Sequence, residues 1–109
     1  MKNFAEKVWA ATKKIPRGKV ASYQQIAIII KHPRAARAVG NALNKNPYAP
    51  IVPCHRVIRS TGKVGGFADG RKKKIALLKR EGVKIVSGRA VDLKKFFIII
   101  NPPIYFGGF

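Results

Sequence analysis

The first apolar residues of the chain recur with the spacing of one helix face. Four of them follow one another at intervals of three or four residues: Phe4, Val8, Ala11 and Ile15. Residues spaced in this way lie on the same side of an α-helix. Pro16-Arg17-Gly18 then interrupts the pattern. The spacing therefore predicts an amphipathic helix over residues 3–14, whose apolar face belongs to the core.

Two shorter helices are predicted around His32-Pro33. Ser22 has Gln25 three residues after it, which is the spacing of a capping box and predicts a helix over residues 23–30. Pro33 suits the first turn of a third helix. That helix has an apolar face and a polar face, formed respectively by Ala35, Ala38, Val39, Ala42 and Leu43 and by Arg34, Arg37, Asn41 and Lys45. Two short helices around a tight turn are typical of a helix-turn-helix, and the polar face is either a DNA contact or a solvated surface.

The segment between residues 46 and 70 has the composition of a loop and a turn. Three prolines precede Cys54, and Ser60-Thr61-Gly62-Lys63 separates two short apolar runs. Proline limits backbone freedom, and Ser, Thr and Gly are common in turns. The segment therefore predicts a rigid loop followed by a hairpin or wing.

A fourth helix and a hairpin are predicted after residue 70. Residues 71–81 return to a helical pattern with Ile75 and Leu78 facing inward, the cations facing outward and Gly82 as the C-cap. The following VKIVSGRAVDL is typical of a small hairpin. The expected fold class is α+β, mostly helical, with short β-hairpins.

The chain divides into a domain over residues 1–95 and an apolar tail over residues 96–109, which either packs on the domain or makes an interface. No apolar run reaches the roughly 18 to 20 residues that cross a bilayer. The start, MKNFAEKVWA, lacks the apolar centre of a signal peptide. We expect a cytoplasmic monomer without a membrane partner.

The charge of the chain is strongly positive, with 23 Lys plus Arg against 4 Asp plus Glu and a net charge of +19. Clustered Lys and Arg displace counterions from a phosphate backbone, so this balance favours a nucleic-acid partner. Acidic membranes and acidic proteins remain alternatives, and some ribosomal or thermophilic proteins are basic for other reasons.

Cys54 and His55 are the candidate chemical groups of the chain. A single cysteine excludes an internal disulfide, and two histidines with four carboxylates make no evident metal site, so we expect no metal. A cationic chain favours the thiolate of Cys54. Neighbouring side chains in a strand point to opposite faces, so activation by His55 requires an irregular backbone or a bridging water. The alternative is an inert buried cysteine.

Five segments of the chain, taken together, form a more specific pattern than Cys54 and His55 alone: VASYQQIA, PRAARAVGNALNKNP, IVPCHRVI, GKVGGFADG and LLKREGV. In order and spacing, over roughly residues 3–95, the chain resembles the DNA-binding and active-site domain of the O6-alkylguanine-DNA alkyltransferases, the methylated-DNA-protein-cysteine methyltransferases. The resemblance implies a winged helix-turn-helix fold. It also implies a stoichiometric repair reaction in which the Cys54 thiolate takes the alkyl group from guanine O6 in duplex DNA. No cofactor is then needed, because the damaged base is the alkyl donor.

The resemblance assigns three further residues to catalysis. His55 would draw the proton of Cys54 through a water, and Glu81 would orient and polarise His55. Asn46 would fix the loop that carries PCHR by bonding to backbone. From the residues alone, Glu81 could equally form a helix-end ion pair with Lys84 or Arg80.

The resemblance also assigns a DNA contact and a base pocket. Arg37 would enter the base stack from a helix lying in the minor groove, and Tyr23 would crowd the rotating phosphate and serve the N3 of the base. The expected DNA contacts are Ser22, Tyr23, Arg34, Ala36, Arg37 and Asn41. The expected pocket residues are Tyr23, Val57, Ile58, Gly65, Gly66, Phe67 and Ala68. The plainer alternatives are a phosphate contact for Arg37 and helix packing for Tyr23.

Three features depart from the family pattern. We expect no separate N-terminal domain, Phe67 stands where many members have tyrosine, and Asp69 stands where glycine is usual. The small alkyltransferase-like proteins, which bind alkylguanine without transferring the group and recruit excision repair, are the main alternative. They usually have tryptophan or alanine in place of the cysteine, so Cys54 favours the enzyme. A winged-helix regulator is a third alternative, but it would have no use for PCHRVI.

Overall fold

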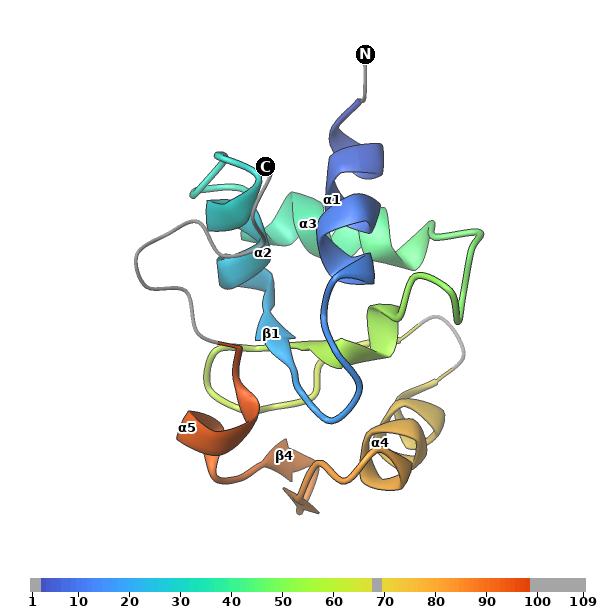
Figure 1. The fold of residues 1–109 in the computed structure, drawn as a ribbon, viewed down its shortest axis with the longest axis vertical. Helices are drawn as coiled ribbons and strands as arrows, with labels where there is room; N and C mark the ends of the chain where they lie inside the picture. The colour runs from blue at the N-terminus through green and yellow to red at the C-terminus, as the bar shows by residue number, and fades with distance from the viewer. Residues whose placement is uncertain (1–2, 68–69, 99–109) are drawn as a thin grey trace.

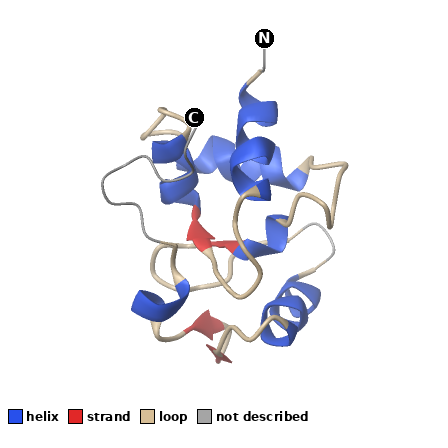
Figure 2. Cartoon of the chain, in the orientation of Figure 1, coloured by secondary structure: helices blue, strands red, loops and turns tan. Residues whose placement is uncertain are grey.

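A short pair of parallel strands lies between two groups of helices in the computed structural model, which describes residues 3–67 and 70–98 (Figure 1). The strands are β1 (Ala21–Ser22) and β2 (Val57–Ile58). One side holds α1 (Phe4–Lys13), α2 (Tyr23–Ile29) and α3 (Ala36–Asn44). The other holds α4 (Arg71–Arg80), the antiparallel hairpin of β3 (Ile85–Val86) and β4 (Arg89–Ala90), and α5 (Leu93–Phe96). A 3₁₀ turn, η1 (Cys54–Arg56), leads into β2. The fold is therefore α+β and mostly helical (Figure 2).

Capping boxes begin the first two helices. The side chain of Asn3 accepts a hydrogen bond from the Glu6 backbone N–H at 2.9 Å at the start of α1. At the start of α2, Ser22 Oγ accepts from the Gln25 N–H at 2.9 Å, and Gln25 Oε1 accepts from the Ser22 N–H at 2.8 Å. Side chains that satisfy these otherwise unpaired N–H groups fix where a helix begins. Both predicted helices and the predicted Ser22 cap are confirmed.

The third helix begins later than predicted. Its first residue is Ala36, and the Ala35 N–H donates to the His32 carbonyl at 2.9 Å, so Pro33 and Arg34 lie in a turn instead. The tight connection to α2 uses these residues, which leaves them unable to form the first helical turn. The predicted apolar face is also wrong at Ala38, which is exposed, because the stripe that packs inward is formed by Val39, Ala42 and Leu43.

The predicted hairpin after Cys54 is not formed between its two apolar runs. Instead, β2 pairs in parallel with β1, in the register Ala21 to Val57 and Ser22 to Ile58. Val57 and Ile58 are completely buried, and an exposed hairpin would have left one of them facing solvent. The turn that follows is closed by the Arg59 N–H donating to the Lys63 carbonyl, and Lys63 then bridges to Arg89. The wing is thus the predicted β3–β4 hairpin with Lys63 beside it.

The fourth helix is confirmed, with one exception to its predicted faces. Leu78 is buried and Ile75 half-buried, but Lys74 is also buried, although the cations were expected to face outward. Lys74 lies four residues before Leu78 and therefore shares its face. Glu81 is the C-cap, and Gly82 follows with φ of 92°, a left-handed conformation suited to glycine.

The two strands connect two hydrophobic clusters. Ala21 and Val57 belong to the cluster between α1, α2 and α3, whereas Val20 and Ile58 belong to the cluster beneath α4 and the hairpin. Successive strand residues face opposite sides, so one strand pair contributes to both clusters.

The beginning of the expected tail packs on the domain. Phe96 is buried in the second cluster, Phe97 bridges to Val20, and the carbonyl of Ile98 accepts from Gln25 Nε2 at 3.0 Å. Residues 99–109 lie outside the described part of the chain. Over residues 3–67 and 70–98, no helix is both long and apolar enough to cross a membrane.

Candidate active site

Cys54 begins the 3₁₀ turn η1 and is a free, half-buried thiol. Its backbone N–H donates to the Val52 carbonyl at 2.8 Å, and the Arg56 N–H donates to the Pro53 carbonyl at 2.9 Å. These bonds wind the chain tightly before it extends into β2. Cys54 and His55 therefore lie on irregular backbone, so the opposite-face geometry of a strand does not separate them.

The loop before Cys54 is held by the side chain of Asn46. Asn46 Nδ2 donates to the Val52 carbonyl at 3.0 Å, and Asn46 Oδ1 accepts from the Tyr48 N–H at 2.9 Å. The Ala49–Pro50 peptide bond within this loop is cis. The amide of Asn46 thus ties both ends of the loop together immediately before the residues that position Cys54.

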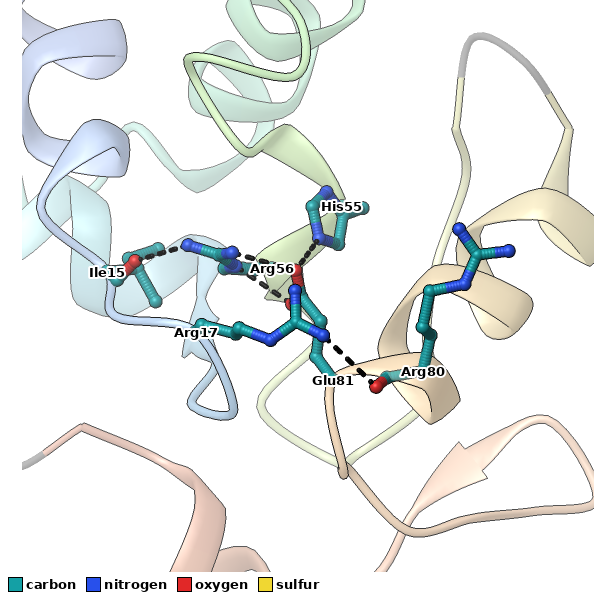
Figure 3. Close-up of polar contacts among 6 residues, drawn as sticks. All are labelled: Ile15, Arg17, His55, Arg56, Arg80 and Glu81. Carbon is teal, nitrogen blue, oxygen red and sulfur yellow. Dashed lines mark hydrogen bonds and ion pairs between the residues drawn. The ribbon is translucent and has the colours of Figure 1, made fainter.

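His55, the residue after Cys54, is in contact with Glu81. Their Nε2 and Oε2 atoms lie 3.0 Å apart, and both side chains are almost fully buried (Figure 3). The contact is close, but no partner meets the angular requirement of a hydrogen bond at the buried Nε2. Burial lowers the pKa of His55, and the carboxylate of Glu81 only partly offsets this effect. His55 is therefore neutral at pH 7.

Arg56 is the second partner of Glu81, and sequence reasoning missed it. Its Nε donates to Glu81 Oε1 at 2.9 Å and its Nη2 to Oε2 at 2.7 Å, while its Nη1 donates to the Ile15 carbonyl at 2.8 Å (Figure 3). Burial alone would raise the pKa of Glu81, but the hydrogen bonds from Arg56 and the close contact with His55 lower it below its usual value. Over the described residues, the ion pairs of Glu81 are with His55 and Arg56, not with Lys84 or Arg80.

Cys54 opens into a cavity of about 350 Å³. Of the expected site residues, the structure brings Tyr23, Ala36, Arg37, Asn41, Gly65, Gly66 and Phe67 to its wall, together with Gly40, Leu43, Asn44 and Arg59. One face of α3 and the thiol of Cys54 thus share one hollow, whose volume lies within the range of small-molecule pockets.

Other expected residues lie elsewhere. Val57 and Ile58 do not line the cavity, because both side chains are completely buried in the two clusters. Ser22 is buried as the cap of α2, and Arg34 is exposed in the turn before α3, away from the cavity wall. Ala68 and Asp69 lie outside the described residues.

Lys74, from α4, lies behind the wall of this cavity and bonds to two of its wall residues, Tyr23 and Gly66. Its side chain is 1% exposed, and its Nζ donates to Tyr23 Oη at 3.2 Å and to the Gly66 carbonyl at 3.1 Å. Burial lowers the pKa of Lys74 to about 8, an effect that the charge of Cys54 opposes. Burial also raises the pKa of the Tyr23 hydroxyl. The signal that could have revealed Lys74 is its position four residues before Leu78.

A glycine leaves room for Tyr23 at the cavity. Gly65 has φ of 75°, and a Cβ built there would lie 3.0 Å from Tyr23 Oη. A side chain at this position would therefore be both strained and crowded. Within residues 3–67 and 70–98, no three His, Cys, Asp or Glu side chains gather in a way that could hold a metal ion.

Sequence comparisons find the same family. A family model described as "6-O-methylguanine DNA methyltransferase, DNA binding domain" matches residues 3–83. The methylated-DNA–protein-cysteine methyltransferase of Methanosarcina acetivorans is 53% identical over 79 residues, which are 72% of this chain and 51% of that protein. The Kluyveromyces lactis enzyme of the same name is 49% identical over 78 residues, 72% of this chain and 41% of that protein. The match thus spans about half the length of these relatives.

Solved structures of related proteins also match this chain. A crystal structure of Mycobacterium tuberculosis OGT in complex with DNA is 49% identical with a TM-score of 0.72, covering 74% of this chain and 49% of that one. S. pombe Atl1, in complex with damaged DNA containing O6-carboxymethylguanine, is 32% identical with a TM-score of 0.80, covering 91% of this chain and 99% of that one. With the family model matching most of its length, this chain belongs to the 6-O-methylguanine DNA methyltransferase family, which it joins through the DNA-binding domain.

Proposed function

We propose that this chain repairs O6-alkylguanine in duplex DNA by moving the alkyl group to the sulfur of Cys54. A bond forms between Sγ and the alkyl carbon, the bond from that carbon to O6 breaks, and the guanine keeps the electron pair and takes up a proton. Each molecule reacts once, because the thioether is stable. The observation that carries the proposal is a free Cys54 at a base-sized cavity, directly before the buried His55 and Glu81 pair.

The pair supplies a base for the thiol. Glu81 is ionised and faces Nε2 of His55, so the proton of a neutral ring sits on Nε2 and leaves Nδ1 able to accept another. A water between Nδ1 and the thiol would complete the transfer, as the family resemblance implies. Arg56 holds Glu81 in place and keeps it ionised, so Arg56 is a positioning residue.

Two further side chains, Lys74 and Tyr23, would assist the transfer of the alkyl group. The positive charge of Lys74 interacts electrostatically with Cys54, whose sulfur is the nucleophile of the proposed reaction. Lys74 also donates to Tyr23 Oη, which frees the hydroxyl proton of Tyr23 for the departing guanine. Because the pKa of Tyr23 is raised, its hydroxyl keeps this proton until the guanine accepts it.

The helix-turn-helix supplies the DNA contact. Arg37 and Asn41 are exposed on α3 and line the same cavity as Cys54, with Ala36 beside them. A base reaches Cys54 only when it leaves the stack, at a cost of a few kcal/mol that is smaller for a weakened pair. In this proposal Arg37, which lines the cavity, fills the vacated position in the base stack, and the net charge of +19 attracts the DNA backbone.

A damage sensor that binds without transferring is the second candidate. The structure of S. pombe Atl1 favours this second candidate, because the alignment with our chain covers 99% of the Atl1 chain. The two candidates differ at the thiol, since a sensor needs the cavity and α3 but no nucleophile. The presence of Cys54 beside His55 supports transfer.

The test is the intact mass of the protein after incubation with a duplex containing one O6-methylguanine, followed by peptide mapping. Transfer adds one methyl group to the peptide that contains Cys54, and Cys54→Ala keeps lesion binding without any mass increase. Lesion-selective binding with unchanged mass in the unaltered protein would establish the sensor instead.

The two histidines of the chain provide a matched pair of variants. His55→Gln should slow methyl transfer by about 10²–10⁴-fold, the usual contribution of a general base. His32→Gln should react at the unaltered rate, because His32 is exposed and packs edge-on against Phe4. Equal rates for the two variants would refute the role of His55.

A further inference from the structure

A second cavity adjoins the one that contains Cys54. Its volume is about 500 Å³, and it shares Arg59, Gly65, Gly66 and Phe67 with the first. The rest of its wall is formed by Lys63, Arg71, Ser87, Gly88 and Arg89. The proposed reaction uses none of these five residues.

Every charged side chain on the described wall of this cavity is a cation. Arg59 and Lys63 come from the turn after β2, Arg71 from the start of α4, and Arg89 from β4. Like charges repel one another, and this repulsion is relieved when an anion lies among them. Three of the four are arginines, whose planar guanidinium group matches two oxygens of a phosphate at once.

The backbone provides a place for one of these arginines. Gly88 has φ of 73°, and a Cβ built on it would collide with Nη2 of Arg71. The guanidinium of Arg71 therefore rests against the tip of the β3–β4 hairpin, and a side chain at position 88 would push it aside. Lys63 bridges to Arg89 in the same hairpin, so the hairpin brings Lys63, Arg89 and Arg71 to one wall.

We infer that this second cavity binds a phosphate group of the DNA strand whose base occupies the Cys54 cavity. The inference rests on the proposed DNA binding. Phosphates flank every nucleotide, so a strand that places its base in the first cavity carries a phosphate past the wall that the two cavities share. Phosphate contacts of this kind fix the register of a protein on DNA without reading its sequence.

The experiment removes one phosphate charge at a time. A methylphosphonate replaces each phosphate in turn on the lesion-bearing strand, and fluorescence anisotropy at one fixed salt concentration gives Kd. For the unaltered protein, one or two positions beside the lesion should weaken binding about tenfold or more, as loss of a charged hydrogen bond does. At those positions Arg71→Ala should show no further loss, because its phosphate contact is already absent.

Two more variants make the result specific. Gly88→Ala crowds Nη2 of Arg71 without changing the charge and should shift the profile toward that of Arg71→Ala. Arg80→Ala removes the same charge from the other end of α4, where the residue is exposed and lines neither cavity, and should keep the unaltered profile. Identical methylphosphonate profiles for Arg71→Ala, Arg80→Ala and the unaltered protein would overturn the inference.

Inorganic phosphate separates a free anion from the DNA strand. Titration of phosphate into the protein without DNA reports anion binding through the amide signals of Gly88 and Arg89. Phosphate binding without any position-specific methylphosphonate effect would also overturn the inference. The outcome is independent of alkyl transfer, since a position-specific effect without a methyl group on Cys54 would leave the inference standing and refute only the repair reaction.

Discussion

A single carboxylate holds three separated parts of the chain together. Glu81, at the end of α4, pairs with His55 and Arg56 of η1, and Arg56 in turn donates to Ile15 after α1. The carboxyl side chain is 7% exposed, so its charge is stable only while both partners remain. The residue that would orient the proposed base also contributes to stability.

Arg56→Met should therefore lower the free energy of unfolding by about 3 kcal/mol, because it leaves a buried carboxylate without its bidentate partner. Urea denaturation followed by circular dichroism at pH 7 measures this. Arg17→Met is the control, since Arg17 is exposed and its contact with the described part of the chain is a long 3.4 Å bond to the Arg80 carbonyl, and it should change stability by less than about 0.5 kcal/mol. Equal losses in the two variants would contradict the role of Arg56.

Burial of Lys74 makes the free energy of unfolding depend on pH in the alkaline range. Its pKa falls from 10.5 in the unfolded chain to about 8 in the fold, so between these values the unfolded state binds a proton that the folded state has lost. Stability should rise across this range, by at most about 1.4 kcal/mol per pH unit. Below about pH 8 both states are protonated and the rise is absent. Tyr23, whose pKa is raised above 10.0, acts in the opposite direction at higher pH.

Lys74→Met should abolish that rise, while Lys79→Met, at an exposed position of the same helix, should keep it. The measurement is the free energy of unfolding in urea at several values between about pH 7.5 and pH 9.5, a window chosen around the lowered pKa. If the free energy of unfolding rose with pH by the same amount in Lys74→Met and in the unaltered protein, burial of Lys74 would have no energetic cost.

At the scale of elements, the start of α2 connects stability to the site. Ser22 caps the helix, and the next residue, Tyr23, lines the cavity and bonds to Lys74. The cap of α1 at Asn3 has the same chemistry but lies outside the Cys54 cavity. The two caps therefore separate a general loss of helix stability from a loss at the site.

Ser22→Ala and Asn3→Ala should each lower the free energy of unfolding by about 1 kcal/mol, the usual effect of losing a cap. Only Ser22→Ala should also slow methyl transfer from a lesion duplex, because fraying of α2 moves Tyr23. Thermal unfolding and single-turnover rates measure the two effects. A similar slowing in Asn3→Ala would mean that stability alone controls the rate.

At the scale of the whole molecule, charge and core are arranged separately. The β1–β2 pair supplies residues to both hydrophobic clusters, so it links the helices α1–α3 to α4 and the β3–β4 hairpin. The net charge of +19 lies mainly on exposed side chains, with Lys74 the buried lysine among the described residues. The core sets the position of the two cavities, and the surface charge sets the attraction for a polyanion.

Binding to duplex DNA should therefore depend steeply on salt. If about 6 to 10 phosphates are contacted, affinity should fall about 10³–10⁵-fold between 50 and 200 mM salt. Titrations at several NaCl concentrations, with and without the lesion, give the slope for each duplex. A shallow slope for both would show that the positive charge of the chain does not serve DNA binding.

Local patterns in the sequence were enough to predict α1, α2 and α4, most of α3, the Ser22 cap and the β3–β4 hairpin, because helix periodicity, capping boxes and turn residues act between neighbours a few residues apart. The late start of α3, the 3₁₀ turn η1 and the short helix α5 were not predicted. The motif around Cys54 similarly indicated the family. Other features depended on the tertiary structure: the parallel pairing of β2 with β1, the burial of Lys74 against Tyr23, the Arg56 contact with Glu81 and the meeting of Arg71 with Gly88. Each joins segments distant in sequence, and the packing of two clusters around one strand pair, which no local period encodes, brings them together.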